Sequence, residues 1–316
     1  MNNILGRIKC FSARLFSSDF WRLNHVVSKK IKDHCIMFLP ASSGDSLLVL
    51  ANLKRIEEDS GVLIFPVIKR SQAVIPELLC CSDYLLYDDY SVFYALPAVK
   101  VAYHCIFGSQ IRAKMRPQIK AGTLFLAHPD KYPESVSVRN HAHTMAEMYM
   151  SFLNLRKMPI WPASVGRITS SIDISVPAQT IMLCPQTASF QDLPHIFWFE
   201  LARNLNDLGW NVCYNTIEPV NYLPNAKWLN CSLRDAVAIG QNVAFVIALR
   251  SGICDLLANI GSRLIAIYPD LIWENGFSCF ETFDLNKFFS RNDIGSCIYT
   301  EKEKVLKYIS AYVGSP

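Results

Sequence analysis

Long hydrophobic runs are the first thing this sequence lacks. No apolar stretch approaches the roughly 20 residues that cross a bilayer, and the N-terminus has no continuous apolar core like that of a signal peptide. The patterns G-x-G-x-x-G, G-x-x-x-x-G-K-[ST], H-E-x-x-H and G-x-S-x-G are also absent. These absences argue against a membrane-spanning protein and against four common enzyme classes. We expect a cytoplasmic protein.

Paired cysteine and clustered histidine patterns are missing too. The eleven cysteines are an odd number, are scattered, and include no C-x-x-C pair. Most lie inside apolar runs, as Cys35, Cys213 and Cys254 do, so we interpret them as buried free thiols in a reducing compartment. His141 and His143 stand in a polar stretch without further ligands nearby in sequence. We therefore expect neither disulfides nor a metal or other cofactor.

Charge is modest and unevenly placed. The 316 residues are 51% hydrophobic and 18% charged, a globular composition with enough length for two domains. The net charge is +4, but residues 1–33 hold seven Lys or Arg against two Asp and so carry +5. The rest of the chain is therefore close to −1, which argues against nucleic acid as a partner.

The basic segment 1–33 also has an amphipathic pattern. Ile4, Ile8, Phe11 and Leu15 recur at helical spacing, with basic residues elsewhere on the helical wheel. A basic amphipathic helix of this kind lies on an anionic membrane surface, here the inner face of the cytoplasmic membrane. The alternative is a helix that packs on the body of the protein and exposes its basic face.

The body of the chain alternates apolar strand-like runs with helical spacing. We expect a first α/β domain over 34–160, a polar proline-containing linker over 161–178, and a second α/β domain over 179–316 whose last helix, 301–313, packs back on the first. Such alternation favours two Rossmann-like domains with parallel sheets and a central cleft. The expected elements include strands at 35–39, 62–67, 84–87, 99–106, 123–127, 180–184 and 210–214, and helices at 45–56, 143–155, 194–208 and 233–240.

One stretch, residues 243–270, has the clearest pattern. Two apolar runs, 244–249 and 264–268, flank the turn Arg250-Ser251-Gly252 and a helical pattern over 253–260. In an open α/β sheet, a helix start beyond the carboxyl end of a strand is where anions bind, because N–H groups and the helix dipole favour negative charge there. The alternative is an ordinary turn with Arg250 on the surface.

Asp45 is the candidate catalytic residue of the first domain. It follows the small residues Ser42, Ser43 and Gly44, which let a ligand approach the backbone, at the start of the helix expected over 45–56. A carboxylate at this place can accept the proton of a hydroxyl nucleophile. The alternative is that Asp45 only caps its helix.

The loop 185–192 is the corresponding candidate in the second domain. Thr187, Ser189 and Gln191 offer hydroxyl and amide groups to a phosphate or ribose, but the loop contains no Lys or Arg. The cation of a phosphate site would therefore have to be Arg250.

Taken together, these motifs resemble the bacterial heptosyltransferase family, glycosyltransferase family 9, which has the two-domain GT-B fold. The resemblance is an order of motifs over most of residues 34–275. It consists of Ser43-Gly44-Asp45 after the first strand, Phe199-Glu200-Leu201-Ala202 in a helix, and Arg250-Ser251-Gly252 before an apolar helix and strand.

The resemblance implies roles for these positions. Asp45 would be the catalytic base, residues 187–191 would line the nucleotide site, and Gly252 with the following amides would hold the donor diphosphate. Three positions depart from the family pattern: its Asp before Ser/Thr-Gly is Arg250, its His is Asp255, and its basic residue before Trp-Pro is replaced by Gln191. Arg250 would replace the charge lost at Gln191.

The sequence thus predicts an inverting, metal-independent glycosyltransferase. Its donor would be a nucleotide-sugar, and its acceptor a lipid-linked saccharide of the lipopolysaccharide, capsule or O-antigen type. The absence of a D-x-D motif argues against the metal-dependent sugar transferases of the other common fold. Two alternatives stay open: another nucleotide-sugar enzyme, such as an epimerase, and an inactive relative that serves polysaccharide assembly.

Overall fold

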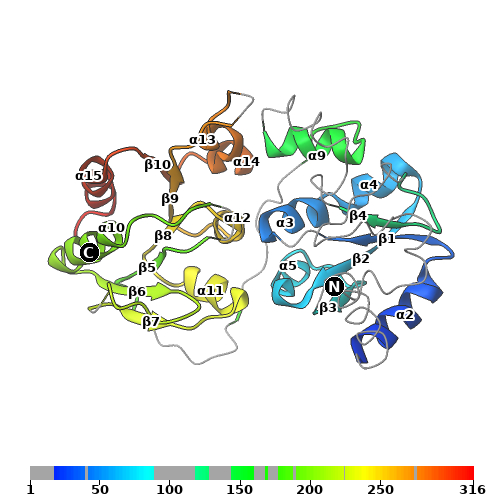
Figure 1. The fold of residues 1–316 in the computed structure, drawn as a ribbon, viewed down its shortest axis with the longest axis horizontal. Coiled ribbons are helices and arrows are strands. Elements are labelled where there is room, and N and C mark those ends of the chain that lie inside the picture. Colours follow the sequence, from blue (N-terminus) through cyan, green and yellow to red (C-terminus); the bar gives the residue numbers. More distant parts are fainter. Residues whose placement is uncertain are drawn as a thin grey trace, which may run out of the picture. The chain divides into compact units, whose positions relative to one another are not determined.

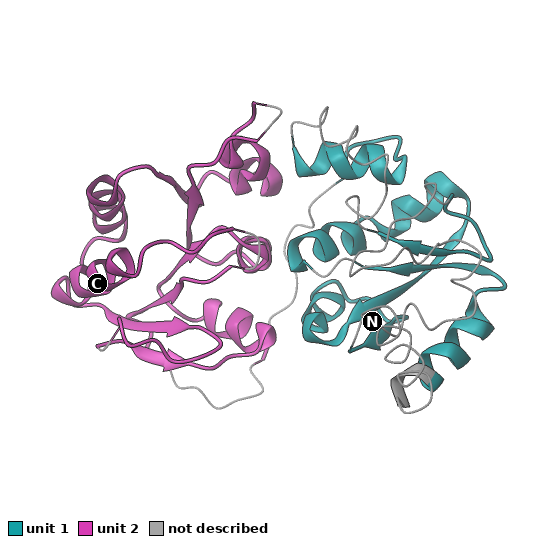
Figure 2. Ribbon diagram, viewed as in Figure 1, with its two compact units in different colours: residues 1–160 teal, residues 161–316 magenta. Residues whose placement is uncertain are grey.

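The computed structural model divides into two compact units, residues 1–160 and 161–316 (Figures 1 and 2). It describes residues 18–39, 42–88, 118–127, 144–159, 168–169, 177–187, 190–223, 225–273 and 276–316. Most of the expected linker, and the strand expected at 99–106, lie outside these ranges. Each unit is built on its own parallel sheet with helices on it.

The sheet of unit 1 centres on β1 (His34–Phe38), whose last four residues are all buried. An unbroken apolar run suits a strand covered on both faces. Its strands are all parallel and lie in the order β3-β2-β1-β4. The other three strands are β2 (Leu63–Lys69), β3 (Leu85–Tyr87) and β4 (Leu124–Leu126).

The helix expected over 45–56 is two helices, α3 (Ser43–Ala51) and α4 (Leu53–Ser60). Asn52 separates them with non-helical backbone angles, and its buried side-chain amide donates to the Leu48 carbonyl at 2.8 Å. Asn favours such local hydrogen bonds over continued helix. The other helices of this unit include η1 (Arg70–Gln72), α5 (Val74–Leu78) and α9 (Met145–Leu153).

Part of the basic N-terminal segment forms α2 (Ser18–Lys30), which packs on β1 and β3. Leu23 and Val27 are buried there, and Lys30 pairs with Asp83 at 2.7 Å. For these residues the structure agrees with the alternative of a helix packed on the body. The amphipathic pattern from Ile4 to Leu15 lies outside the described residues, and its membrane contact stays a prediction.

The sheet of unit 2 is parallel, with the order β10-β9-β8-β5-β6-β7. Alternate residues of β8 face opposite sides, so Ile247 and Leu249 join one buried cluster and Val246 and Ala248 the other. Its strands are β5 (Thr180–Cys184), β6 (Asn211–Asn215), β7 (Lys227–Leu229), β8 (Phe245–Leu249), β9 (Leu264–Pro269) and β10 (Gly295–Tyr299).

Helices cover both faces of this sheet. Helices α10 (His195–Asp207) and α15 (Lys302–Val313) contribute to one buried cluster. The other cluster includes residues of α11 (Leu233–Gly240), α12 (Gly252–Asn259), α13 (Cys279–Phe283) and α14 (Leu285–Phe289). Helices α13 and α14 and strand β10 were not expected from the sequence.

The last helix, α15, belongs to the core of unit 2. The buried side of α15, with Val305, Leu306, Ile309 and Val313, belongs to the core of unit 2, and the Trp210 indole N–H donates to the Gly314 carbonyl at 2.8 Å. The apolar side of α15 therefore packs on its own unit. The expected packing of this helix on the first domain stays a prediction. No helix in the described ranges is both long and apolar enough to cross a membrane.

Candidate functional site

The order of strands in unit 2 places a switch point between β5 and β8. From β5 the chain moves through β6 and β7 to one edge, and then returns to place β8 on the other side of β5. The chain therefore leaves β5 and β8 in opposite directions, and ligands of such sheets bind beside such a point at the carboxyl edge. The loops after β5 and β8 are residues 185–192 and the turn Arg250-Ser251-Gly252, the two stretches predicted from the sequence.

Ser251 and Gly252 start α12 at this switch point. Ser251 is the N-cap residue in extended conformation, yet its side chain makes no capping bond. The Ser251 Oγ atom is buried and lies near the Cys254 thiol, but it has no hydrogen-bond partner of good geometry among the described residues. The Cys254 N–H donates to the Ser251 carbonyl at 2.9 Å, whereas the N–H groups of Gly252 and Ile253 have no acceptor within the helix. Together with these two groups, the Ser251 hydroxyl can donate to an anionic ligand.

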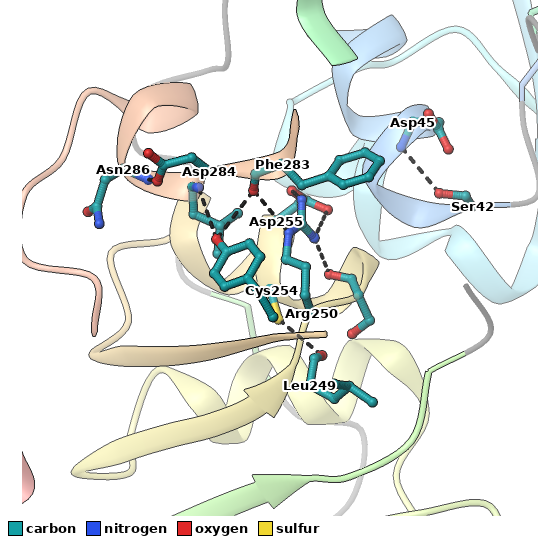
Figure 3. A network of polar contacts seen from close by, with 12 residues as sticks. Ser42, Asp45, Leu249, Arg250, Cys254, Asp255, Phe283, Asp284 and Asn286 are labelled. Atoms are coloured by element: carbon teal, nitrogen blue, oxygen red, sulfur yellow. Dashed lines mark hydrogen bonds and ion pairs between the residues drawn. The ribbon is translucent and has the colours of Figure 1, made fainter. Parts of the chain in front are cut away.

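Arg250 does not face outward as a free cation. Its guanidinium is buried, with 3% of the residue exposed, and makes two bonds to the Asp255 carboxylate: Nη2 to Oδ1 at 2.7 Å and Nη1 to Oδ2 at 3.0 Å (Figure 3). Nη1 also donates to the Ser251 carbonyl at 2.7 Å, and Nε to the Phe283 carbonyl at 3.2 Å. Burial by itself would lower the pKa of Arg250, but the Asp255 carboxylate, together with Tyr268 and Cys254, raises it, and the net result is a raised pKa.

This pairing changes the interpretation of both residues. Arg250 and Asp255 are two of the positions that depart from the family pattern, and they bond to each other. The sequence predicts that Arg250 supplies the positive charge of a phosphate site. In the structure its charge is balanced by the Asp255 carboxylate, so the ion pair is neutral as a unit. The alternative of an ordinary turn with Arg250 on the surface is wrong, because Arg250 is buried.

The loop after β5 contributes further polar groups. The Thr187 N–H donates to the Asp192 carboxylate at 3.4 Å, and the Gln186 amide oxygen accepts from the Ile217 N–H at 3.4 Å. Gln191 is exposed. Ser189 lies outside the described residues. Side chains of Gln186 and Asp192 thus fix described parts of this loop. The roles of Thr187 and Gln191 in donor binding stay predictions.

Three aromatic residues meet at the same edge. Phe190 lies within the predicted stretch 187–191, whereas Trp273 and Phe283 were missed from the sequence. Phe190 follows β5, and Trp273 and Phe283 follow β9; their ring centroids lie 6.2 to 6.3 Å apart. The Arg250 guanidinium lies 5.5 Å from the Phe283 ring, and the Trp273 indole N–H is buried without an acceptor among the described residues. No local pattern joins these residues, because only the β5-β8-β9 order brings their loops together.

Unit 1 has its own switch point, between β1 and β4, and Asp45 stands at the carboxyl end of β1. The cap of α3 is Ser42, whose hydroxyl accepts from the Asp45 N–H at 3.5 Å. Asp45 is therefore not the cap. Ser43 and Gly44, expected in the loop, form the first turn of the helix. No hydrogen bond or ion pair engages the half-buried Asp45 carboxylate within the described part of the chain.

The residue after Asp45 fixes this turn in place. Ser46 and Gln72 are both buried, and the Ser46 hydroxyl donates to the Gln72 amide oxygen at 2.8 Å. This bond ties the start of α3 to η1, which follows the neighbouring strand β2.

The described residues contain no group of three or more His, Cys, Asp or Glu side chains that is suited to a metal ion.

Comparison with known proteins identifies the fold. No protein-family model matches the chain, and no curated protein matches it in sequence. Among solved structures, E. coli ADP-heptose lps heptosyltransferase II matches with a TM-score of 0.56 at 12% identity, covering 89% of this chain and 98% of that one. The chain has the heptosyltransferase fold.

Two further structures support this assignment. A family 9 glycosyl transferase from Veillonella parvula matches with a TM-score of 0.51 at 13% identity, over 89% of this chain and 97% of that one. E. coli heptosyltransferase WaaC, solved with ADP-2-deoxy-2-fluoro heptose, matches with a TM-score of 0.50 at 12% identity, over 88% and 99%. The matches extend over both units, so the two-domain α/β architecture of the GT-B type is the one predicted from the sequence.

Proposed function

We propose that this protein is a glycosyltransferase that uses a nucleotide-sugar donor. The observation that carries the proposal is the start of α12 at the switch point of unit 2, where open N–H groups meet a buried, unpartnered Ser251 hydroxyl. The chain has this site in a fold shared, over most of its length, with a heptosyltransferase solved with an ADP-sugar analogue. A nucleotide diphosphate has the charge and the acceptor oxygens that such a site binds.

In the proposed reaction, Asp45 accepts the proton of an acceptor hydroxyl. That oxygen forms a bond to the anomeric carbon of the donor sugar while the bond from this carbon to the diphosphate oxygen breaks, which inverts the configuration. The negative charge that develops on the leaving diphosphate is stabilised by the Ser251 hydroxyl and the N–H groups that begin at Gly252. No metal ion takes part, and residues 187–191 line the nucleotide.

The proposed acceptor is a lipid-linked saccharide of the lipopolysaccharide, capsule or O-antigen type. Support comes from the printed name of the similar lps heptosyltransferase and from the charge of +5 in residues 1–33. Such a segment is attracted to anionic lipid, so the enzyme would act in the cytoplasm at the inner face of the membrane.

Replacement of the proposed base tests this mechanism. In Asp45→Asn, the amide is unable to accept the proton, so we expect the turnover number to fall by about 10²- to 10⁴-fold while donor affinity is retained. Glu58→Gln, on the exposed side of the nearby helix α4, is the matched control and should keep full activity. Unchanged turnover in Asp45→Asn would refute the assignment.

The same assay separates the alternatives. A transferase releases nucleotide only when an acceptor is supplied, whereas an epimerase changes the donor without acceptor. An inactive relative does neither. The replacement of three family positions at the donor side, by Arg250, Asp255 and Gln191, is the observation that favours the inactive alternative.

A further inference from the structure

We infer that Arg250 and Asp255 form a positioning pair that presets the anion-binding turn of unit 2 and does not itself contact the ligand. The inference rests on the proposed function only for the identity of the ligand. Arg250 and Asp255 both depart from the family pattern, and they bond to each other. The two replacements therefore act together, as one ion pair.

The bonds of the pair connect the end of β8, the turn and the start of α12. Arg250 is the residue directly after β8, and Asp255 stands in the first turn of α12, so their two bonds close the turn that contains Ser251 and Gly252. The bond from Arg250 Nη1 to the Ser251 carbonyl fixes the peptide plane of that turn directly. The bond from Nε to the Phe283 carbonyl then ties the turn to the end of α13.

Most N–H donors of Arg250 are already used within the protein. A guanidinium has five N–H donors, and four are used in the bonds to Asp255, Ser251 and Phe283. Both side chains are almost fully buried, at 4% and 3% exposure. To bind a phosphate, Arg250 would have to leave a buried carboxylate without its partner, which is strongly unfavourable.

Arg250 also fixes the position of Ser251. With its carbonyl fixed by Arg250 and its backbone extended at the N-cap, the Ser251 hydroxyl stays buried but unpaired. A donor held unpaired in a rigid turn is preorganised for an incoming acceptor, and small displacements of such a group greatly weaken its function. The pair therefore acts on ligand binding through Ser251.

The test replaces the pair by apolar residues of similar size, in Arg250→Met with Asp255→Leu. Removing both charges of a buried pair commonly preserves stability, whereas removing one does not. We expect the double variant to keep its melting temperature and to lose at least tenfold in affinity for the nucleoside diphosphate that stabilises the native protein most among ADP, GDP, UDP and TDP. Hydrogen exchange of the backbone at 250–256 should be faster than in the native protein.

The matched control is a second doubly bonded pair near the other end of the same helix. Arg291 contacts Asp293 through two N–O contacts of 2.7 Å and donates to the Ala258 and Ser262 carbonyls. Arg291→Met with Asp293→Leu should leave nucleotide affinity and exchange at 250–256 unchanged. Asp255→Asn, which keeps one acceptor for the guanidinium, should give an intermediate loss if the double variant does not fold.

Each outcome bears on the inference. Native affinity and native exchange at 250–256 in the apolar double variant would overturn it, as would an Asp255→Asn protein that folds and binds normally. If the native protein binds none of the nucleotides, the proposed function fails, but the exchange measurement still decides whether the pair holds the turn.

Discussion

At the scale of single residues, Ser251 gives the sharpest prediction. In the free protein its hydroxyl is buried and unpaired, so Ser251→Ala should leave the melting temperature unchanged or raise it slightly. In the complex it would donate to a charged phosphate oxygen, and such bonds contribute about 1.5–3 kcal/mol. We therefore expect nucleotide affinity to fall roughly tenfold to a hundredfold, measured by calorimetric titration.

Ser262→Ala is the counterpart of that variant. The Ser262 hydroxyl is buried but donates to the Gly240 carbonyl at 2.9 Å. Its removal should lower the free energy of unfolding by about 1 kcal/mol or more, since it leaves that carbonyl unpaired, and should not change nucleotide affinity. If both serine variants lose affinity alike, the special role of Ser251 is wrong.

The thiols make a second prediction at this scale. Burial raises the pKa of both Cys213 and Cys297 to about 12. At pH 8 the folded protein therefore keeps these groups as neutral thiols, and only the thiolate reacts with iodoacetamide. We expect exposed Cys80 to be labelled in the native protein, and Cys213 and Cys297 only after unfolding. Mass spectrometry of labelled peptides measures this order, and rapid native labelling of Cys213 would contradict it.

Sequence reasoning found the backbone positions of the site more readily than its side-chain contacts. A strand buried on both faces is a continuous apolar run, so its end can be located where the run stops. The positions that follow such runs include Asp45, Ser251 and Gly252. The bond between Arg250 and Asp255 spans a strand end and a helix turn, so no helical or strand periodicity predicts it. The aromatic contact of Phe190 with Trp273 and Phe283 depends on strand order alone.

At the scale of elements, α15 should contribute strongly to the stability of unit 2. Ile309 is fully buried in the cluster that joins α15 to α10 and the sheet. Ile309→Ala should lower the free energy of unfolding by about 2–5 kcal/mol, because the lost methyl groups leave a cavity. Exposed Lys307→Ala on the same helix should change it by less than about 0.5 kcal/mol. Urea denaturation measures both, and a loss below about 1 kcal/mol in Ile309→Ala would contradict this packing.

The differences between the expected and the observed elements have local physical causes. The sequence predicts one helix over 45–56 because the apolar spacing continues past Asn52. In the structure the helix is interrupted at Asn52, whose buried side chain donates a hydrogen bond to the Leu48 carbonyl. Helices α13 and α14 are five residues each, too short for periodicity to appear. In β10, only the first residue is buried, so it lacks the apolar run of the inner strands.

At the scale of the whole molecule, both units have a switch point in their sheet. In each unit the chain forms a buried first strand, adds the next two strands on one side of it, and then places the following strand on its other side. Each sheet therefore has a switch point beside its first strand. The candidate base, Asp45, stands at one switch point, and the candidate anion site, Ser251 and Gly252, at the other. Strand–helix alternation predicts two such sheets from sequence, whereas the strand orders come only from the structure.

Binding of a nucleotide to the turn at Ser251 and Gly252 is the central claim, and thermal stabilisation tests it most directly. The purified protein is melted alone and with ADP, GDP, UDP, TDP or CMP, with Ser251→Ala measured in parallel. A ligand at about one hundred times its dissociation constant stabilises the folded protein by roughly 2.7 kcal/mol. We predict a clear rise in melting temperature with one of these nucleotides and a smaller rise in Ser251→Ala at equal concentration. No rise with any of them, or an equal rise in both proteins, would contradict the assignment of this site.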